Sequence, residues 1–365
     1  MKNLLFIVLA VLTLTSCQSK TAADESPANF KIFKGTNIAH WLSQSKNRGA
    51  ERNSFFQEKD VIAIKELGFD HLRLPVDEEQ MWDENGIRHE DAFKLMTNCL
   101  DWCMKHQLKV IVDLHILRSH HFNAEVKPLW TDPKEQEKFY NLWVDLSSAL
   151  KKYPVSEVAY ELMNEAVADD PEQWNNLLAN ALKTIRTLEP ERIIVIGSNK
   201  WQSANTFDVL KVPNDKNIIL SFHFYEPFLL THYHASWTAL RDYTGPAHYP
   251  GALLTQAEFD ALSPDQQAIA KNWVNKVWNI EKLEQMMQLP LQKAKELGLQ
   301  LYCGEYGVIE NAPEADKIRW YNDMISVFNK NGIASANWNY KSGQFGLTDG
   351  KGTQRKAMTE AILKR

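Results

Sequence analysis

Two glutamates follow short apolar runs and have neighbours suited to proton transfer. Glu165 closes Met163-Asn164-Glu165, and Glu305 stands in Gly304-Glu305-Tyr306-Gly307. Two carboxyls in different surroundings can divide the roles of acid and base, because burial and nearby charge shift each pKa separately. The pair therefore indicates acid–base or nucleophilic chemistry, provided that the fold brings both side chains together.

Polar and aromatic residues occur at matching places in other apolar runs. These residues are Arg73, His115, His223, Tyr225 and Trp338. Arg73, His223 and Tyr225 could supply the hydrogen bonds and positive charge that keep one carboxylate ionised. Trp338 could form the floor for a ring-shaped substrate.

The runs that carry these residues alternate with amphipathic stretches, which indicates βα units and a parallel sheet. We predict eight strands, over Ile32–Ile38, His71–Val76, Lys109–His115, Val158–Glu165, Arg192–Asn199, Asn217–Tyr225, Gln300–Gly307 and Ile333–Tyr340. We predict helices between them, over Gln57–Leu67, Ala92–His106, Lys134–Tyr153, Pro171–Leu188, Trp273–Leu297 and Ala315–Asn331. Eight such units predict an α/β fold, a single-domain (β/α)₈ TIM barrel over residues 30–365.

The chain is longer than a bare barrel requires, and the surplus has one obvious location. Residues 226–272 follow the predicted sixth strand and are rich in aromatic side chains. Gly245-Pro246 and Ser263-Pro264 interrupt this segment. We therefore expect an enlarged loop after strand six, lying over the barrel mouth.

The active site of such a barrel is built at the carboxyl ends of its strands. Strands four and seven face each other across the mouth, so Glu165 and Glu305 should converge there. One protonated acid and one ionised carboxylate are what the hydrolysis of a glycoside requires.

Six stretches together resemble glycoside hydrolase family 5, the cellulase family. They are Leu72-Arg73-Leu74-Pro75, Asp113-Leu114-His115, Met163-Asn164-Glu165, Phe222-His223-Phe224-Tyr225, Gly304-Glu305-Tyr306-Gly307 and Asn337-Trp338. They occur in the order that the family shows and span about residues 32–345. Ala166 departs from the family, which more often has Pro after the glutamate.

The resemblance implies a role for each of these residues. Glu165 would be the acid/base and Glu305 the nucleophile, while Asn164 would bind the sugar 2-hydroxyl. Arg73 and Tyr225 would contact the nucleophile, His115 and His223 would line the site, and Trp338 would stack on the substrate. The family retains anomeric configuration, which implies carboxyl groups about 5–5.5 Å apart.

Other candidates depend on single residues. Trp201 is a candidate substrate contact, and Trp41 is either a sugar contact or a core residue. His232 with His234, and His120 with His121, have spacings that metals can use, but the chemistry needs no metal, so we expect no metal and no cofactor. The chain has no Gly-x-Ser-x-Gly, His-Glu-x-x-His or Gly-rich nucleotide motif.

The N-terminus has the pattern of a bacterial lipoprotein. Lys2 precedes an apolar stretch over residues 4–14 that is too short to span a bilayer, and Leu14-Thr15-Ser16-Cys17 follows. We predict a signal peptide over 1–17 with a lipidated Cys17 and a polar tether over 18–29. We therefore expect the protein in the cell envelope, anchored through its lipid to the outer membrane, on the periplasmic face or at the cell surface. An ordinary signal peptide is the alternative.

Composition limits the possible partners. The chain of 365 residues has a formal net charge of −5 and no basic block, so a nucleic-acid partner is not expected. Twelve Trp and eleven Tyr are enough to furnish a core and a sugar cleft. The family resemblance implies an endoglucanase-like enzyme that cleaves a β-glucan, with β-1,4-glucan favoured, and we expect it to be a monomer. A β-mannanase, an exo-acting β-glucosidase and a non-catalytic surface glycan-binding lipoprotein are the alternatives.

Overall fold

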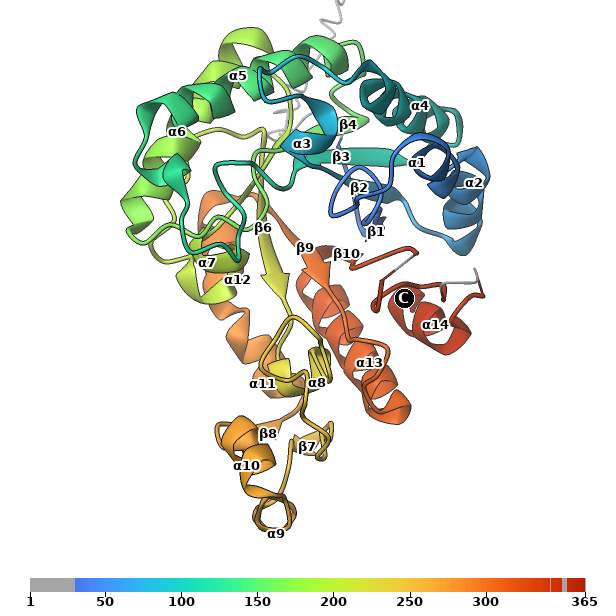
Figure 1. Ribbon diagram of the computed structural model, residues 1–365. Helices are drawn as coiled ribbons and strands as arrows, with labels where there is room; N and C mark the ends of the chain where they lie inside the picture. The colour runs from blue at the N-terminus through green and yellow to red at the C-terminus, as the bar shows by residue number, and fades with distance from the viewer. Residues whose placement is uncertain (1–29, 342, 350–352, 365) are drawn as a thin grey trace, which may run out of the picture.

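The computed structural model describes residues 30–341, 343–349 and 353–364 (Figure 1). The predicted signal peptide, Cys17 and the tether lie outside these residues. Among the described helices, none has both the length and the apolar character needed to cross a bilayer.

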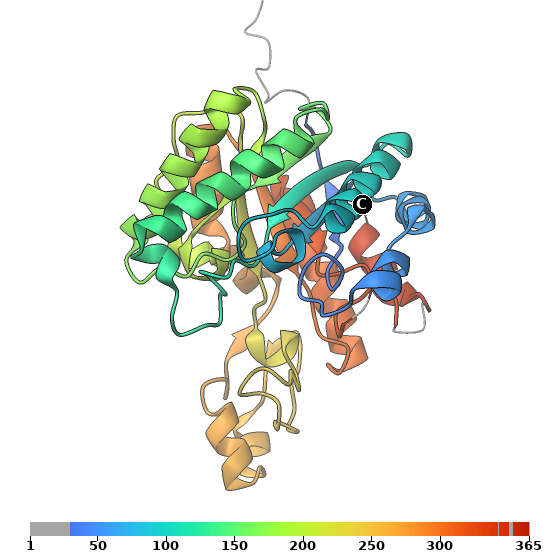
Figure 2. The same cartoon turned by 45° about the horizontal axis from the view of Figure 1, so that its top comes forward.

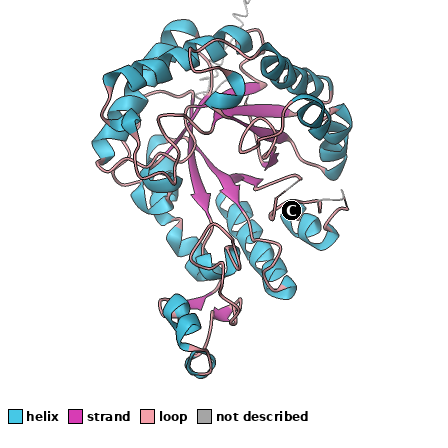
Figure 3. Ribbon diagram, viewed as in Figure 1, coloured by secondary structure: helices cyan, strands magenta, loops and turns pink. Residues whose placement is uncertain are grey.

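Eight parallel strands close into a barrel, with helices arranged around it (Figure 3). The barrel strands are β1 (Lys34–Asn37), β2 (His71–Val76), β3 (Lys109–Leu114), β4 (Val158–Glu161), β5 (Ile194–Gly197), β6 (Ile218–Phe224), β9 (Gln300–Tyr306) and β10 (Ala334–Asn337). Each strand pairs with the next along the chain, and β10 pairs with β1 to complete the circle. The predicted (β/α)₈ barrel is confirmed.

The barrel interior has an apolar layer below a polar one. Ile111, Ala159, Val195 and Ile219 belong to a fully buried cluster that is separate from the main core. Side chains of a strand alternate between its two faces, so Asp113 and Glu161, two residues after Ile111 and Ala159, point into the barrel as well. The strand register places Asp113 directly beside Glu161. The sequence alternation thus puts two carboxylates above the apolar layer.

Helices cover the outside of the barrel. They are α1 (Gly49–Phe55), α2 (Glu58–Leu67), α3 (Glu78–Met81), α4 (Glu90–Lys105), α5 (Pro133–Leu150), α6 (Pro171–Leu188), α11 (Ile280–Met286), α12 (Gln288–Leu297), α13 (Glu314–Asn331) and α14 (Lys356–Leu363). Local signals set their ends: Gln57 and Asp60 form a capping box on α2, and Gly68 ends it in the left-handed region at φ 100°.

Several predicted elements begin or end one to three residues away from the observed bounds, and two predictions were wrong by more than that. β4 ends at Glu161, so Glu165 lies in the loop beyond the strand rather than at its last position. The helix predicted over residues 273–297 is divided, because Asn279 caps the new helix α11 by accepting a hydrogen bond from the Lys282 amide. The residues before Asn279 form strand β8 (Val277–Trp278), which pairs with a distant strand.

The segment after β6 forms a small folded unit. It contains α8 (Phe228–Thr231), β7 (Gly251–Ala252), α9 (Gln256–Asp260), α10 (Pro264–Ala270) and β8, and β7 pairs antiparallel with β8. We call residues 226–279 the insertion. Figures 1 and 2 both show α9 and α10 projecting away from the barrel. The expected enlargement is present, but its distal half does not lie over the mouth.

Candidate active site

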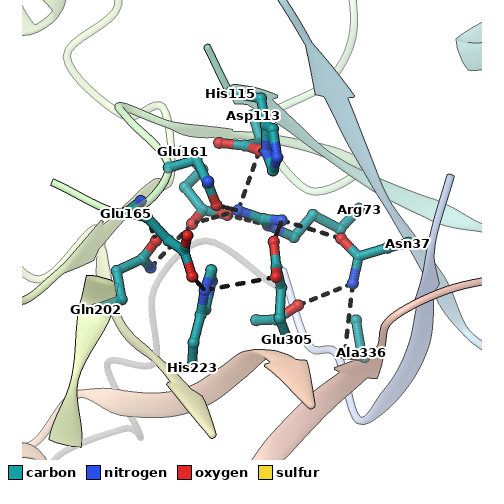
Figure 4. A network of polar contacts seen from close by, with 12 residues as sticks. Asn37, Arg73, Asp113, His115, Glu161, Glu165, Gln202, His223, Glu305 and Ala336 are labelled. Atoms are coloured by element: carbon teal, nitrogen blue, oxygen red, sulfur yellow. Dashed lines mark hydrogen bonds and ion pairs between the residues drawn. The ribbon is translucent and has the colours of Figure 1, made fainter. Parts of the chain in front are cut away.

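Arg73 lies at the centre of the polar layer and is fully buried (Figure 4). Its guanidinium donates to Glu161 through Nε at 2.7 Å and to Glu305 through Nη1 at 2.7 Å. Nη2 is 3.0 Å from an oxygen of Asp113. A planar group with five donors can serve several carboxylates at once. Arg73 therefore fixes Glu305 from inside the barrel.

Two amides complete the surroundings of Arg73. Nη1 also donates to Asn37 at 3.0 Å, and Nη2 donates to the Asn164 side-chain oxygen at 2.9 Å. The Asn164 amide nitrogen is buried and has no hydrogen-bond partner among the described residues. A buried donor without a partner is costly unless a ligand uses it. Asn164 is therefore free to donate to a substrate hydroxyl, as the family resemblance implies.

Glu165, in the loop after β4, and Glu305, on β9, face each other. Oxygens of the two carboxyls and a ring nitrogen of His223 all lie within 4.8 Å of one another. His223 Nδ1 is 2.9 Å from Glu165 Oε1 and 3.6 Å from Glu305 Oε2. The Tyr225 hydroxyl donates to Glu305 Oε2 at 3.0 Å. This spacing suits direct attack by one carboxylate, because a water-mediated mechanism needs a wider gap.

The two carboxyls have different electrostatic surroundings. Burial and the negative charge of Glu305 raise the pKa of Glu165 well above its usual value. Burial also raises the pKa of Glu305, but the charge of Arg73 and the Tyr225 hydrogen bond oppose that rise. Glu305 is thus the carboxyl that ionises first, and Glu165 keeps the proton. Burial and Arg73 lower the pKa of His223 well below its usual value, so this neutral ring contributes a hydrogen bond and no charge.

His115 and Trp338 form one wall of the site. Their rings stack with centroids 5.5 Å apart and an interplanar angle of 7°. His115 Nδ1 contacts Asp113 at 2.7 Å, and burial lowers the pKa of His115 to about 3. A neutral His115 that donates through Nδ1 keeps its ring fixed against Trp338. Both residues therefore lie where the sequence predicted them.

A cavity of about 1080 Å³ opens above the two carboxyls. Its walls include His40, Asn164, Trp201, Trp237, Trp338 and Phe345. Trp201 is 45% exposed and Trp237, from the insertion, is 55% exposed. Exposed indole faces beside a polar centre suit a ligand with apolar C–H faces and hydroxyl edges, such as a sugar chain.

Trp41 does not belong to this cavity. Its side chain is 1% exposed, its Nε1 donates to the Arg52 carbonyl at 2.8 Å, and its ring packs against Phe56. The prediction that Trp41 contacts a sugar is therefore corrected to its alternative, a core residue.

Several residues of the site were not predicted from the sequence. The residue types of Glu161 and Gln202 do not indicate a place in an active site, and Asp113 was part of a predicted motif without a role of its own. The alternation that turns Glu161 into the barrel, two residues after Ala159, was the available signal. Trp237 and His40 could only be found from the folded structure. In the part of the chain that the structure describes, the potential metal-ligand group is Glu165, His223 and Glu305, which are the reacting residues themselves.

Comparisons with known proteins identify relatives that match most of the chain. The chain is 33% identical over 337 residues to endoglucanase C of Acetivibrio thermocellus, covering 90% of this chain and 96% of that protein. It is 31% identical to cellodextrinase A of Ruminococcus flavefaciens, covering 83% and 84%. A solved structure of Thermotoga maritima Cel5A with cellobiose matches with a TM-score of 0.73 at 25% identity, covering 92% of this chain and 98% of that one. The model of the family described as cellulase (glycosyl hydrolase family 5) matches residues 24–344, and the chain therefore belongs to that family.

Proposed function

We propose that this protein is a retaining glycoside hydrolase that cleaves β-1,4-linked glucan. The observation that carries the proposal is the pair Glu165 and Glu305. Their oxygens lie within 4.8 Å, and Arg73 and Tyr225 donate hydrogen bonds to Glu305, which favours its ionised form. One acid and one nucleophile at this separation are the requirement for double displacement.

The first step breaks the glycosidic bond. A Glu305 oxygen attacks the anomeric carbon while the Glu165 proton passes to the leaving oxygen. The glycosidic C–O bond breaks, the leaving sugar departs with that proton, and the remaining sugar is joined to Glu305 as an ester. Asn164 holds the 2-hydroxyl during this step through its free amide N–H.

The second step releases the sugar. Glu165, now ionised, removes a proton from water as the water oxygen attacks the anomeric carbon. The ester C–O bond breaks and returns the electron pair to Glu305, where Arg73 and Tyr225 stabilise the carboxylate. The anomeric carbon is inverted once in each step, so the product keeps the anomeric configuration of the substrate.

The substrate follows from the cavity and the relatives. The relatives described above are named an endoglucanase and a cellodextrinase, and these names support a glucan substrate. The projection of α9 and α10 away from the barrel supports a cleft that accepts internal positions of a chain. Digestion of a long soluble β-1,4-glucan should therefore give products of mixed lengths. Release of single glucose units, or turnover of a β-mannan in preference to glucan, would support an alternative activity.

A pair of variants tests the chemistry. Glu305→Ala should remove turnover of an aryl β-cellobioside while the unfolding temperature stays near that of the wild type. Glu296→Ala, an exposed glutamate on α12, is the matched control and should keep full activity. Turnover that survives Glu305→Ala would disprove the role of Glu305. Binding of glucan by the wild type without release of reducing ends would favour the non-catalytic glycan binder.

We also propose that Cys17 is lipidated and anchors a monomer to the cell envelope. The support is the pattern of residues 1–17, in which Cys17 closely follows the apolar stretch over residues 4–14. The wild type should partition with membranes and take up labelled fatty acid. Cys17→Ser should do neither. Release of the wild type as an unlipidated protein would support the ordinary signal peptide instead.

A further inference from the structure

Two loops of the active site are joined by a row of hydrogen bonds. The Asn199 side chain accepts from the Ala168 amide at 2.9 Å and donates to the Ala168 carbonyl at 3.0 Å. The Trp201 amide donates to the Ala166 carbonyl at 3.2 Å. The Gln202 side-chain oxygen accepts from the Glu165 amide at 2.9 Å. The loop after β4, which carries Glu165, is thus held along its length by the turn after β5.

The other end of Gln202 reaches into the polar layer. Its side-chain nitrogen donates to Glu161 Oε1 and to the Ser221 hydroxyl, both at 3.1 Å. Glu161 in turn accepts from Arg73, and Arg73 donates to Glu305. Figure 4 shows Gln202 beside Glu161 and Glu165. A continuous path of hydrogen bonds therefore runs from the Glu165 backbone to the Glu305 carboxylate.

The hydrogen bond between the Glu165 amide and the Gln202 side chain joins two backbone segments with positive φ, a conformation that is unfavourable for residues other than glycine. Lys200, Trp201 and Gln202 have φ of 52°, 60° and 51°, and Glu165 has φ of 44°. Non-glycine residues in the left-handed region each cost free energy and persist only where surrounding contacts hold them. Gln202 is 1% exposed and supplies such contacts to Glu165.

We propose that Gln202 is a positioning residue that sets the orientation of the acid/base Glu165 relative to the nucleophile Glu305. The inference rests on the proposed hydrolysis. Gln202 fixes the backbone from which the Glu165 side chain extends, while His223 fixes its carboxyl end. The same turn also places Trp201 in the cavity wall. The position of the Trp201 indole and that of Glu165 therefore depend on the same turn.

The acid, rather than the nucleophile, depends on Gln202. Without Gln202, Glu161 still accepts from Arg73 with both oxygens, and Arg73 still contacts Asp113, Asn37 and Asn164. Glu305 therefore stays in place. The Glu165 amide, by contrast, loses the acceptor that holds it in the left-handed region. Removing Gln202 should impair proton donation and leave nucleophilic attack almost intact.

Leaving-group dependence separates these two effects. An aryl β-cellobioside with a poor leaving group, such as phenol, needs the proton from Glu165, whereas 2,4-dinitrophenolate departs without it. Displacement of a reacting group by about 1 Å costs about 10²-fold, so Gln202→Leu should lower kcat/KM by about 10²-fold on the phenyl substrate and by less than about threefold on the dinitrophenyl one. The ratio of kcat/KM for the dinitrophenyl substrate to kcat/KM for the phenyl substrate therefore measures proton donation by Glu165 alone.

Two further variants exclude general damage. Gln80→Leu removes another fully buried glutamine, which bridges Arg52 and Ser45, and should leave that ratio unchanged. Gly197→Ala keeps Gln202, but its Cβ would lie 2.3 Å from Gln202 Cγ and must displace that side chain. It should reproduce the leaving-group dependence of Gln202→Leu.

The outcomes distinguish this inference from the proposed hydrolysis. If the wild type hydrolyses neither substrate, the proposed function is wrong. If the wild type hydrolyses both, and Gln202→Leu and Gly197→Ala lower both rates by the same factor, Gln202 does not position the acid. If either variant does not fold, the other decides between these outcomes by the same ratio.

Discussion

Arg73 is the guanidinium that three buried carboxylates share, and its removal should test the electrostatics of the barrel. Arg73→Met leaves Asp113, Glu161 and Glu305 without the positive charge that now opposes the effect of their burial. Breaking a buried ion pair by removing one partner costs about 3–5 kcal/mol. Because three carboxylates lose the same partner, we expect the upper end, about 5 kcal/mol, which is a large part of the total stability of an ordinary domain.

The loss should depend on pH in a defined direction. Without Arg73 the pKa of each carboxyl rises further above its value in the unfolded chain. A carboxyl of this kind destabilises the folded state at pH above the unfolded pKa, and proton uptake on acidification removes the penalty. The stability difference between wild type and Arg73→Met should therefore be largest near pH of about 8 and smaller near pH of about 5.

Thermal unfolding at both pH values measures this difference. Arg192→Met is the matched control, because Arg192 is also buried but pairs with one carboxylate, Glu189, which keeps the hydroxyl donors of Ser147 and Tyr160. Its stability loss should vary less with pH. A loss for Arg73→Met that is constant between the two pH values, or larger in acid, would refute the reasoning.

Three other substitutions have defined outcomes. Tyr225→Phe removes a hydrogen bond that lowers the pKa of Glu305, so the acidic limb of the kcat/KM profile should move to higher pH; a limb that stays in place would argue against that contact. Trp201→Ala should raise KM for cello-oligosaccharides by about 2–10-fold, as expected for about 0.5–1.5 kcal/mol of ring contact, with no change in unfolding temperature. Trp41→Ala should cost about 3–5 kcal/mol in unfolding free energy and leave KM unchanged; a rise in KM matching that of Trp201→Ala would return Trp41 to the binding site.

The barrel could be predicted from the sequence because the residues that mark its strands and helix ends are local to each element. Runs such as Val110-Ile111-Val112 are continuously apolar in the sequence, and in β3 they are buried on both faces. Glycines after Leu67, Leu297 and Asn331 end their helices in the left-handed region, and each was visible in the sequence. Local chemistry of this kind does not depend on the rest of the chain.

The internal structure of the insertion and the polar contacts inside the site could not be predicted in the same way. The pairing of β7 with β8 joins residues far apart in sequence, and two-residue strands have no periodicity to detect. Glu161 belongs to the site because the strand register places it beside Asp113. Gln202 belongs to the site because its turn adopts the left-handed region. Neither position can be inferred from the residue type alone.

The pairing of β7 with β8 has a consequence for modifying the protein. Gly251 lies opposite Trp278, so the chain leaves and returns through neighbouring points before and after residues 253–276. The entropy of closing a loop rises slowly with its length, so a segment whose two ends lie close together tolerates changes in length. This segment is thus an attachment point, where a reporter or an affinity module could replace α9 and α10 without altering the barrel strands.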